Sequence, residues 1–225
     1  MHYFDHCIHF ADGLSGQIPA GKVVCVGLNY RDHISEMNIQ PGAEPVLFMK
    51  PSTALAFLEQ PIAIPTTLGA CHHEIEMAVL IGEQLCQCNE QEADAAIAGV
   101  GVALDLTLRE LQLQLKQKGL PWDKAKAFDG ACPTSAFVDR ARVADLQDLP
   151  IRLTVNGDLR QQSSTAMMLT PVTQLIAYIS GFFTLMPGDI VLTGTPAGVG
   201  PLAPGDRLLV ELGDLLAVST EVVAR

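Results

Sequence analysis

Short apolar segments follow one another closely along this chain, and this succession constrains the fold more than any other feature of the sequence. The segments with strand-like composition span residues 22–27, 45–49, 61–65, 73–81, 100–106, 151–155, 190–193, 207–212 and 216–223. Few helix-sized segments separate them, whereas parallel pairing needs a long crossover that is usually helical. We therefore expect an α+β fold, with a layered, mostly antiparallel β-sheet and a few peripheral helices.

Local signals predict a helix and a hairpin within this pattern. Residues 107–118 have a helix-forming composition, and Gly119 follows them as a stop signal. Thr107, followed three residues later by Glu110, fits a capping box at the start of this helix. The Asn-Gly pair at 156–157 lies between two apolar runs and predicts a two-residue hairpin turn. Further helices are expected near residues 29–37, 90–97 and 170–183.

Composition favours a folded chain and restricts its partners. Of the 225 residues, 48% are hydrophobic and 17% are charged, so a large core can form and disorder is not expected. We expect one domain over residues 1–225, with an N-terminal arm at 1–20 and the core at 21–225. The net charge of −11 argues against nucleic acid and against an anionic membrane, because both need a basic face. A small anionic substrate remains compatible, since local cations and a bound metal can reverse the field in one cleft.

The sequence as given shows no targeting feature. Its first residues have no basic start and no long apolar run, and no apolar stretch reaches the roughly 18 residues of a membrane span. The six cysteines form no CxxC pair and no disulfide framework. Reduced thiols are the simplest interpretation, and we expect a cytoplasmic protein.

Three acidic residues lie within or beside apolar strands. Glu74 and Glu76 are two residues apart, so their side chains point to the same face of a strand, and MAVLIG follows them directly. Asp105 is isolated in the apolar segment VGVALDLTL. Like charges in such a place are costly unless a cation balances them. The three acids therefore predict a site for Mg²⁺ or Mn²⁺, which prefer oxygen ligands.

Two alternatives stay open from these residues alone. Glu74 and Glu76 could be exposed, with Asp105 capping the helix that follows it. His72 and His73 could bind zinc, although a polar strand end or an indirect contact with the site is the simpler interpretation.

Other polar residues are candidates for the chemistry. His33 and Glu36 are three residues apart on an expected helix, so they can touch, and a histidine oriented by a carboxylate is a usual general base. Lys50 and Lys126 follow apolar runs or lie near aromatic residues, where either could bind an anion. A solvated helix face and surface lysines would explain the same residues.

Two further segments could contact a ligand at the metal. Arg109 and Gln112 share one face of the helix that follows Asp105. The loop 193–201, TGTPAGVGP, offers backbone N–H groups and the hydroxyl of Thr195, which suit a carboxylate. The loop lacks the ending of a P-loop, and the absence of a GxSxG elbow argues against a serine hydrolase.

Taken together, several segments resemble the fumarylacetoacetate hydrolase family, in its short single-domain branch of acylpyruvate hydrolases. The matching segments are CVGLNYRDHISEM, EPVLFMKPSTAL, HHEIEMAVLIG, GVALDLTLRELQ, GLPWDKAKAFDGACP, VNGDLRQ and LTGTPAGVGPL. They occur in the family's order and cover most of the chain. The HHE-x-E segment, followed by Asp-x-Thr-x-Arg and GTP-x-GVGP, is specific to this family.

The resemblance implies a β-roll or sandwich fold, a homodimer and a role for each candidate residue. The implied ligands of Mg²⁺ or Mn²⁺ are Glu74, Glu76 and Asp105. The implied water-activating pair is His33 and Glu36, and Lys126 is implied to stabilise developing negative charge. The implied substrate contacts are Lys50, Arg109, Gln112 and Thr195. One departure is Leu28, where relatives often carry a polar or basic residue.

The activity that the resemblance implies is hydrolysis of a C–C bond in 2,4-diketo acids. Acylpyruvates such as acetylpyruvate or fumarylpyruvate would give pyruvate and a carboxylic acid. Alternatives at the same metal site are oxaloacetate decarboxylation, oxaloacetate tautomerisation and isomerisation of a 2-hydroxy-diene-dioate. The last alternative is a module that binds a keto acid without turning it over.

Overall fold

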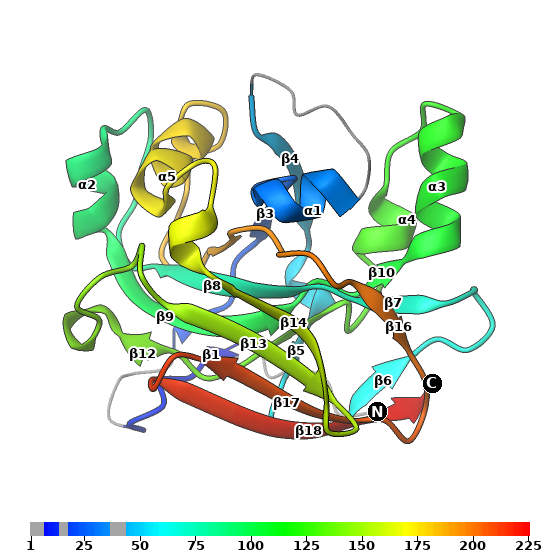
Figure 1. Cartoon of the computed structure of the whole chain (residues 1–225). Helices are drawn as coiled ribbons and strands as arrows, with labels where there is room; N and C mark the ends of the chain where they lie inside the picture. The colour runs from blue at the N-terminus through cyan, green and yellow to red at the C-terminus, as the bar shows by residue number, and fades with distance from the viewer. Residues whose placement is uncertain (1–6, 14–17, 37–43) are drawn as a thin grey trace.

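One large sheet positions the residues discussed above (Figure 1). The structure, a computed structural model, describes residues 7–13, 18–36 and 44–225. In hydrogen-bonding order, the sheet contains β4 (Val46–Lys50), β3 (Val23–Gly27), β15 (Ile190–Leu192), β8 (Ile75–Ile81), β9 (Ile97–Leu104), β11 (Cys132–Thr134) and β5 (Leu55–Phe57), and β12 (Val138–Asp139) also pairs with β9. The pairs β3–β15 and β5–β11 are parallel and the others are antiparallel.

The central strands of this sheet are buried on both faces. Every residue of β8 is buried. Met77 and Val79 pack into the main core, whereas Ala78 and Leu80 belong to a second apolar cluster. A strand that is covered on both faces carries a continuous apolar run. This coverage explains why the sequence loses its alternation after Glu76.

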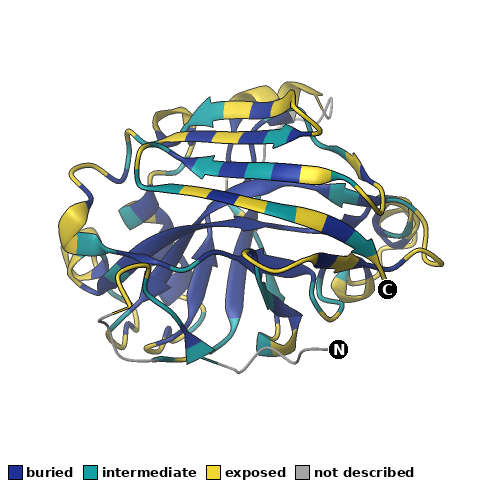
Figure 2. Ribbon diagram, turned by 90° about the horizontal axis from the view of Figure 1, so that it is seen from below, coloured by how far each residue is buried: buried dark blue, intermediate teal, exposed yellow. Residues whose placement is uncertain are grey.

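A second sheet covers one face of the first. Its strands, in order, are β14 (Asp158–Ser164), β13 (Pro150–Val155), β17 (Arg207–Leu212), β18 (Leu216–Ala224) and β6 (Ile62–Ile64). Buried and exposed residues alternate along these strands (Figure 2). Ile151 and Leu153 join the main core and Arg152 between them is exposed, which is the pattern of a sheet with one solvated face.

The helices lie above the second sheet in the view of Figure 1, and buried residues of the segment Val172–Ser180 join the same main core as that sheet. They are α1 (Arg31–Glu36), α2 (Glu90–Ala95), α3 (Arg109–Gln117), α4 (Asp123–Lys126) and α5 (Val172–Ser180), with short 3₁₀ turns at Ser52–Ala54, Arg140–Arg142 and Thr165–Met167. None of the described helices has the length and apolar surface that crossing a membrane requires.

Two small sheets complete the described structure. The strands β10 (Thr107–Leu108), β7 (Cys71–His73) and β16 (Gly200–Leu202) pair beside the acidic residues. The predicted N-terminal arm, residues 1–20, lies partly outside the described residues. Its described part contains β1 (Cys7–Ile8) and β2 (Ile18–Pro19), which pair with each other.

The expected antiparallel α+β architecture and the hairpin are confirmed. Asn156 and Gly157 join β13 to β14, and both have positive φ, 54° and 86°. This is the left-handed backbone that a two-residue type I′ turn requires at both positions, and Asn and Gly are the residues that adopt it most readily.

The predicted capping box is wrong. The helix α3 begins at Arg109, and its N-cap, Leu108, makes no side-chain hydrogen bond to the helix. Thr107 lies in β10 instead, where it is the partner of His72, and its hydroxyl donates to the carbonyl of Asp105. Pairing with β7 therefore outweighs the local capping preference.

Candidate active site

The large sheet brings three acidic side chains together. Glu76 lies in β8, Glu74 lies at the junction of β7 and β8, and Asp105 directly follows β9. The two strands are antiparallel neighbours, and the Asp105 N–H donates to the Glu74 carbonyl at 2.8 Å. All three side chains are buried, and each offers an oxygen within 4.8 Å of the others. No other such group of possible metal ligands occurs among the residues the structure describes.

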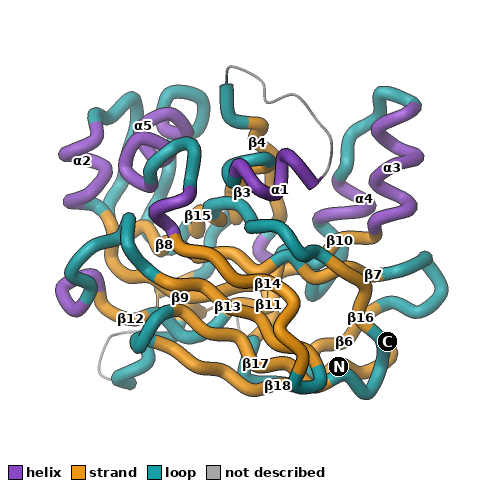
Figure 3. Tube along the Cα trace, viewed as in Figure 1, coloured by secondary structure: helices purple, strands orange, loops and turns teal. Residues whose placement is uncertain are grey.

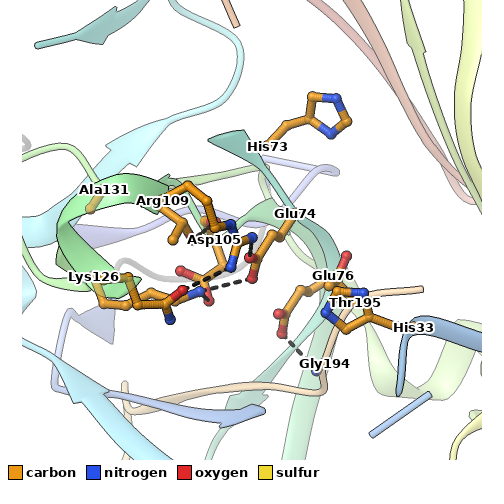
Figure 4. A network of polar contacts seen from close by, with 12 residues as sticks. His33, His73, Glu74, Glu76, Asp105, Arg109, Lys126, Ala131, Gly194 and Thr195 are labelled. Atoms are coloured by element: carbon orange, nitrogen blue, oxygen red, sulfur yellow. Dashed lines mark hydrogen bonds and ion pairs between the residues drawn. The ribbon is translucent and has the colours of Figure 1, made fainter. Parts of the chain in front are cut away.

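Cations from two helices contact these acids (Figure 4). Lys126, at the end of α4, donates to Glu74 Oε2 at 2.8 Å and to Asp105 Oδ2 at 2.6 Å. Arg109, at the start of α3, donates to Glu74 Oε1 and to Gln112 Oε1. Burial raises the pKa of Glu74, but Lys126 and Arg109 outweigh it and bring the pKa down to about 2. Burial lowers the pKa of Lys126, but the carboxylates of Asp105 and Glu74 outweigh this effect and raise the pKa above its ordinary value.

Glu76 differs from Glu74 because no cation contacts it among the described residues. Its one described hydrogen bond comes from the Gly194 N–H, at 2.6 Å to Oε2. Burial, followed by the nearby charges of Asp105 and Glu74, raises its pKa well above the ordinary value. A buried carboxylate of this kind is stable as an anion only when a further positive charge is supplied.

A divalent cation fits this donor set. Glu76 is buried and no cation contacts it among the described residues, and its carboxylate lies beside those of Glu74 and Asp105. Three carboxylate oxygens from two strands match the preference of Mg²⁺ or Mn²⁺ for oxygen ligands. Glu74, Glu76 and Asp105 could therefore hold the ion.

Lys50 lies behind the acids rather than among the residues that face the cavity. It is fully buried, and its Nζ donates to the carbonyls of Lys126 and Ala131. The same Nζ forms an ion pair with Asp105 Oδ1 at 2.8 Å. Because its ammonium is enclosed by these oxygens, this geometry does not fit the substrate contact that the resemblance implies. Lys50 instead neutralises part of the charge of Asp105.

A cavity opens beside the three acids. Its walls also include His33, Arg109, Gln112, Lys126 and Thr195. The structure thus brings nine of the ten candidate residues to one place, if Glu36 is included through its contact with His33. A larger cavity of about 370 Å³, next to β1, contains none of the ten.

The histidine and its carboxylate lie at one side of this cavity. His33 Nδ1 is 3.1 Å from Glu36 Oε2, and His33 is buried whereas Glu36 is exposed. The Gly198 N–H contacts both Glu36 oxygens, at 3.1 and 3.3 Å. The loop between β15 and β16 passes beside α1 (Figure 3), and it also holds Glu76 through Gly194. One loop therefore connects the histidine pair to a candidate metal ligand.

The sequence interpretation missed three residues at the site. Lys116 and Trp122 line the cavity, and the Lys116 ammonium lies 4.6 Å from the centre of the Trp122 ring. Gln161, on β14, is buried beneath the loop and donates to Thr195. The sequence signal for Gln161 was its place in the VNGDLRQ segment. Lys116 had no such signal, because another lysine lies close to it and both are exposed.

The two histidines beside the acids do not join them. His73 Nδ1 is 2.9 Å from Gln161 Oε1, and burial lowers its pKa. Its ring points away from the acidic cluster (Figure 4), and neither His72 nor His73 belongs to the group of possible metal ligands. This arrangement does not favour the zinc alternative.

Comparisons with known proteins identify the family of this chain. Residues 22–223 match the family described as fumarylacetoacetate (FAA) hydrolase C-terminal. Oxaloacetate tautomerase YcgM from Escherichia coli is 56% identical over 193 residues, covering 85% of this chain and 88% of that protein. Human mitochondrial oxaloacetate tautomerase FAHD1 is 42% identical over 201 residues, covering 89% and 91%.

A solved structure links the same fold to a metal and a keto acid. The crystal structure of fumarylpyruvate hydrolase from Pseudomonas aeruginosa in complex with Mn²⁺ and pyruvate superposes with a TM-score of 0.92 at 34% identity. The match covers 97% of this chain and 96% of that one. The chain therefore belongs to the fumarylacetoacetate hydrolase family.

Proposed function

We propose that this protein interconverts the keto and enol forms of oxaloacetate, with Mg²⁺ or Mn²⁺ held by Glu74, Glu76 and Asp105. The observation that carries the proposal is the buried trio of carboxylates, whose oxygens lie within 4.8 Å of one another and in which no cation among the described residues contacts Glu76. The two tautomerases named above, 56% and 42% identical, support the choice of oxaloacetate.

The cations around the cavity suit a substrate with two carboxylates. Arg109 and Lys126 are already engaged with the acids. Lys116 has no ion pair with any described residue and faces the ring of Trp122. It is therefore available for the second carboxylate of oxaloacetate, which pyruvate and other monocarboxylates lack.

The proposed chemistry is a proton transfer between C3 and the C2 oxygen. When bound, the metal supplies Lewis-acid polarisation of the keto group. His33, oriented by Glu36, removes the C3 proton with its Nε2 and then delivers this proton to the C2 oxygen, which gives the enol; the reverse transfer gives back the keto form. Lys126 has one N–H beyond the two that bind Glu74 and Asp105, and it donates this N–H to the oxygen that gains negative charge.

Hydrolysis of acylpyruvates is the second candidate. The pair of His33 and Glu36 could equally activate a water molecule, and the fumarylpyruvate hydrolase structure contains pyruvate. Isomerases of 5-carboxymethyl-2-hydroxymuconate and of 2-hydroxyhepta-2,4-diene-1,7-dioate also occur among the structural relatives, at 34% and 35% identity. All of these reactions begin with a 2-keto or 2-enol acid, and the fold alone does not select among them.

A substrate panel tests the proposal. Ultraviolet absorbance follows the loss of the enol of oxaloacetate and the loss of the diketo-acid chromophore of acetylpyruvate and fumarylpyruvate. Each assay is run with Mn²⁺, with Mg²⁺ and with a chelator, and with Asp105→Ala as a second test of the metal site. We expect metal-dependent tautomerisation that exceeds C–C cleavage. Faster cleavage of a diketo acid would replace the proposal with the hydrolase, and full activity in Asp105→Ala would refute the assignment of the metal ligands.

The homodimer and the cytoplasmic location stay predictions. Size-exclusion chromatography with light scattering measures the first, and fractionation of cells that produce the protein measures the second.

A further inference from the structure

Gln161 belongs to the second sheet, yet its side chain reaches the candidate active site. It lies on β14 and is 1% exposed. Its Oε1 accepts from the Ile75 N–H at 3.0 Å and lies 2.9 Å from His73 Nδ1. Its Nε2 donates to Thr195 Oγ1 and to the Pro196 carbonyl, both at 2.9 Å. All four hydrogen-bonding positions of this amide are therefore used.

Two backbone groups determine which way the amide points. The N–H of Ile75 can only donate, so the atom that faces it must be the amide oxygen. The carbonyl of Pro196 can only accept, so the atom that faces it must be the amide nitrogen. Exchange of the two amide atoms would place like groups against each other on both sides. This orientation also fixes the direction of the other two hydrogen bonds: the amide oxygen accepts from His73, and the amide nitrogen donates to Thr195.

The hydroxyl of Thr195 therefore receives a hydrogen bond from Gln161 and keeps its own proton. Thr195 is 4% exposed, lines the cavity, and has no other hydrogen-bond partner among the described residues. It directly follows Gly194, whose N–H holds Glu76. The proton of Thr195, which lies beside Glu76 (Figure 4), is thus left for a ligand that enters the cavity.

We propose that Gln161 is a positioning residue that makes Thr195 a hydrogen-bond donor for the carboxylate of a 2-keto acid. The inference rests on the proposed function only in taking such an acid as the ligand. His73 supports the arrangement, because its Nδ1 must carry a proton to face the amide oxygen. Gln161 acts through Thr195 and does not touch the reacting atoms.

Substitution by glutamate tests this role. In Gln161→Glu an ionised carboxylate offers no donor, so the Thr195 hydroxyl turns its proton toward residue 161 and away from the ligand. Because a hydrogen bond to a charged group contributes about 1.5–3 kcal/mol, we expect the Kd of pyruvate to rise about 10- to 100-fold. Isothermal titration calorimetry measures Mn²⁺ binding first and then pyruvate binding to the Mn²⁺-loaded protein. The Kd of Mn²⁺ should change by less than about threefold, since Gln161 contacts none of the three acids.

Two further variants separate positioning from a purely structural role. The matched control is Gln162→Glu, one residue away on the same strand and exposed, which should leave both affinities unchanged. In a Thr195→Val background, which has no hydroxyl to orient, Gln161→Glu should weaken pyruvate binding by less than about twofold more. If the glutamate variant does not fold, Gln161→Met is used instead; it has no donor and only a weak acceptor, so a smaller rise in the Kd of pyruvate is expected.

Three results would overturn the inference: a parallel loss of Mn²⁺ and pyruvate affinity, a full additional effect of Gln161→Glu in Thr195→Val, or no binding of pyruvate to the Mn²⁺-loaded protein. Oxaloacetate tautomerisation is assayed separately on the same samples. If pyruvate binding follows the expected pattern and tautomerisation is absent, the proposed function fails and the role of Gln161 remains.

Discussion

Asp105 and Glu76 should respond in opposite ways to the same isosteric change from acid to amide. Asp105 contacts two buried ammonium groups, with Oδ1 2.8 Å from Lys50 and Oδ2 2.6 Å from Lys126. Glu76 contacts no cation among the described residues and accepts from the Gly194 N–H. We therefore expect Asp105→Asn to destabilise the metal-free protein and Glu76→Gln to leave its stability unchanged or raise it.

The expected sizes follow from burial. Lys50 and Asp105 are 0% and 1% exposed, and removal of one partner of a buried ion pair costs about 3–5 kcal/mol. For a chain of this length, about 1 kcal/mol shifts Tm by roughly 2–4 °C, so Asp105→Asn should lower Tm by about 6–20 °C. In Glu76→Gln the amide oxygen can still accept from Gly194, and the change removes a charge whose raised pKa shows that burial disfavours it.

Differential scanning calorimetry at neutral pH measures both effects, with a chelator and with excess Mn²⁺. At a metal concentration 100 times its Kd, binding stabilises the wild-type protein by about 2.7 kcal/mol, or roughly 5–11 °C. Asp105→Asn and Glu76→Gln should lose this Mn²⁺-dependent rise in Tm, whereas the exposed control Glu221→Gln should keep it. The reasoning fails if Glu76→Gln destabilises the metal-free protein as much as Asp105→Asn, or if either variant retains the wild-type response to Mn²⁺.

Three other outcomes are expected at the same site. His33→Gln should abolish tautomerisation but keep the Kd of Mn²⁺ within about threefold, because His33 contacts Glu36 and none of the three candidate metal ligands. Calorimetry measures the Kd and the enol assay measures tautomerisation, and loss of Mn²⁺ binding would contradict the prediction. Lys116→Gln should raise the KM for oxaloacetate about two- to fivefold and leave the KM for its 4-methyl ester unchanged. The control is Lys118→Gln, at the C-cap of the same helix, and equal effects of Lys116→Gln on both substrates would exclude a contact with the distal carboxylate. The affinity for Mn²⁺ should fall as pH decreases, by up to about tenfold per unit below the raised pKa of Glu76, because the metal needs the ionised carboxylate; a pH series of titrations measures this, and constant affinity across the acidic range would count against Glu76 as a ligand.

The sequence predicted strands of both main sheets, and the hairpin turn at Asn156-Gly157, because these features have local causes. An apolar run with a turn signal at each end forms a strand wherever a core is available, and the Asn156-Gly157 turn needs only its own two residues. Glu74 and Glu76 could be placed on one side for the same reason, since a strand has a period of two. Asp105 required one further step, because it joins them only when β8 and β9 are neighbours.

The partners of these acids could not be predicted from spacing. Lys126 lies 52 positions from Glu74 along the chain, and Gln161 lies 34 positions from Thr195. Such contacts depend on how α4 and the second sheet pack against the large sheet, and no local sequence pattern predicts this packing. The environment of Lys50 could not be predicted either, because a lysine at the end of a strand can face solvent, a ligand or the core. Three strands of the large sheet lie between β4, whose last residue is Lys50, and β9, which precedes Asp105, so no local pattern indicates that the two residues meet.

Charge balance gives a reason for the combination of metal and cations at this site. The carboxylates of Glu74, Glu76 and Asp105 carry three negative charges, and the nearest cations, Lys50, Lys126 and Arg109, carry three positive ones. When all three acids are ionised, as metal binding requires, these charges cancel, so the protein groups themselves provide no net attraction for an anion, and the whole chain carries −11. A divalent cation would leave this cluster at +2, which matches the two carboxylates of oxaloacetate. Affinity for a doubly charged keto acid should therefore depend on bound metal more steeply than affinity for pyruvate does.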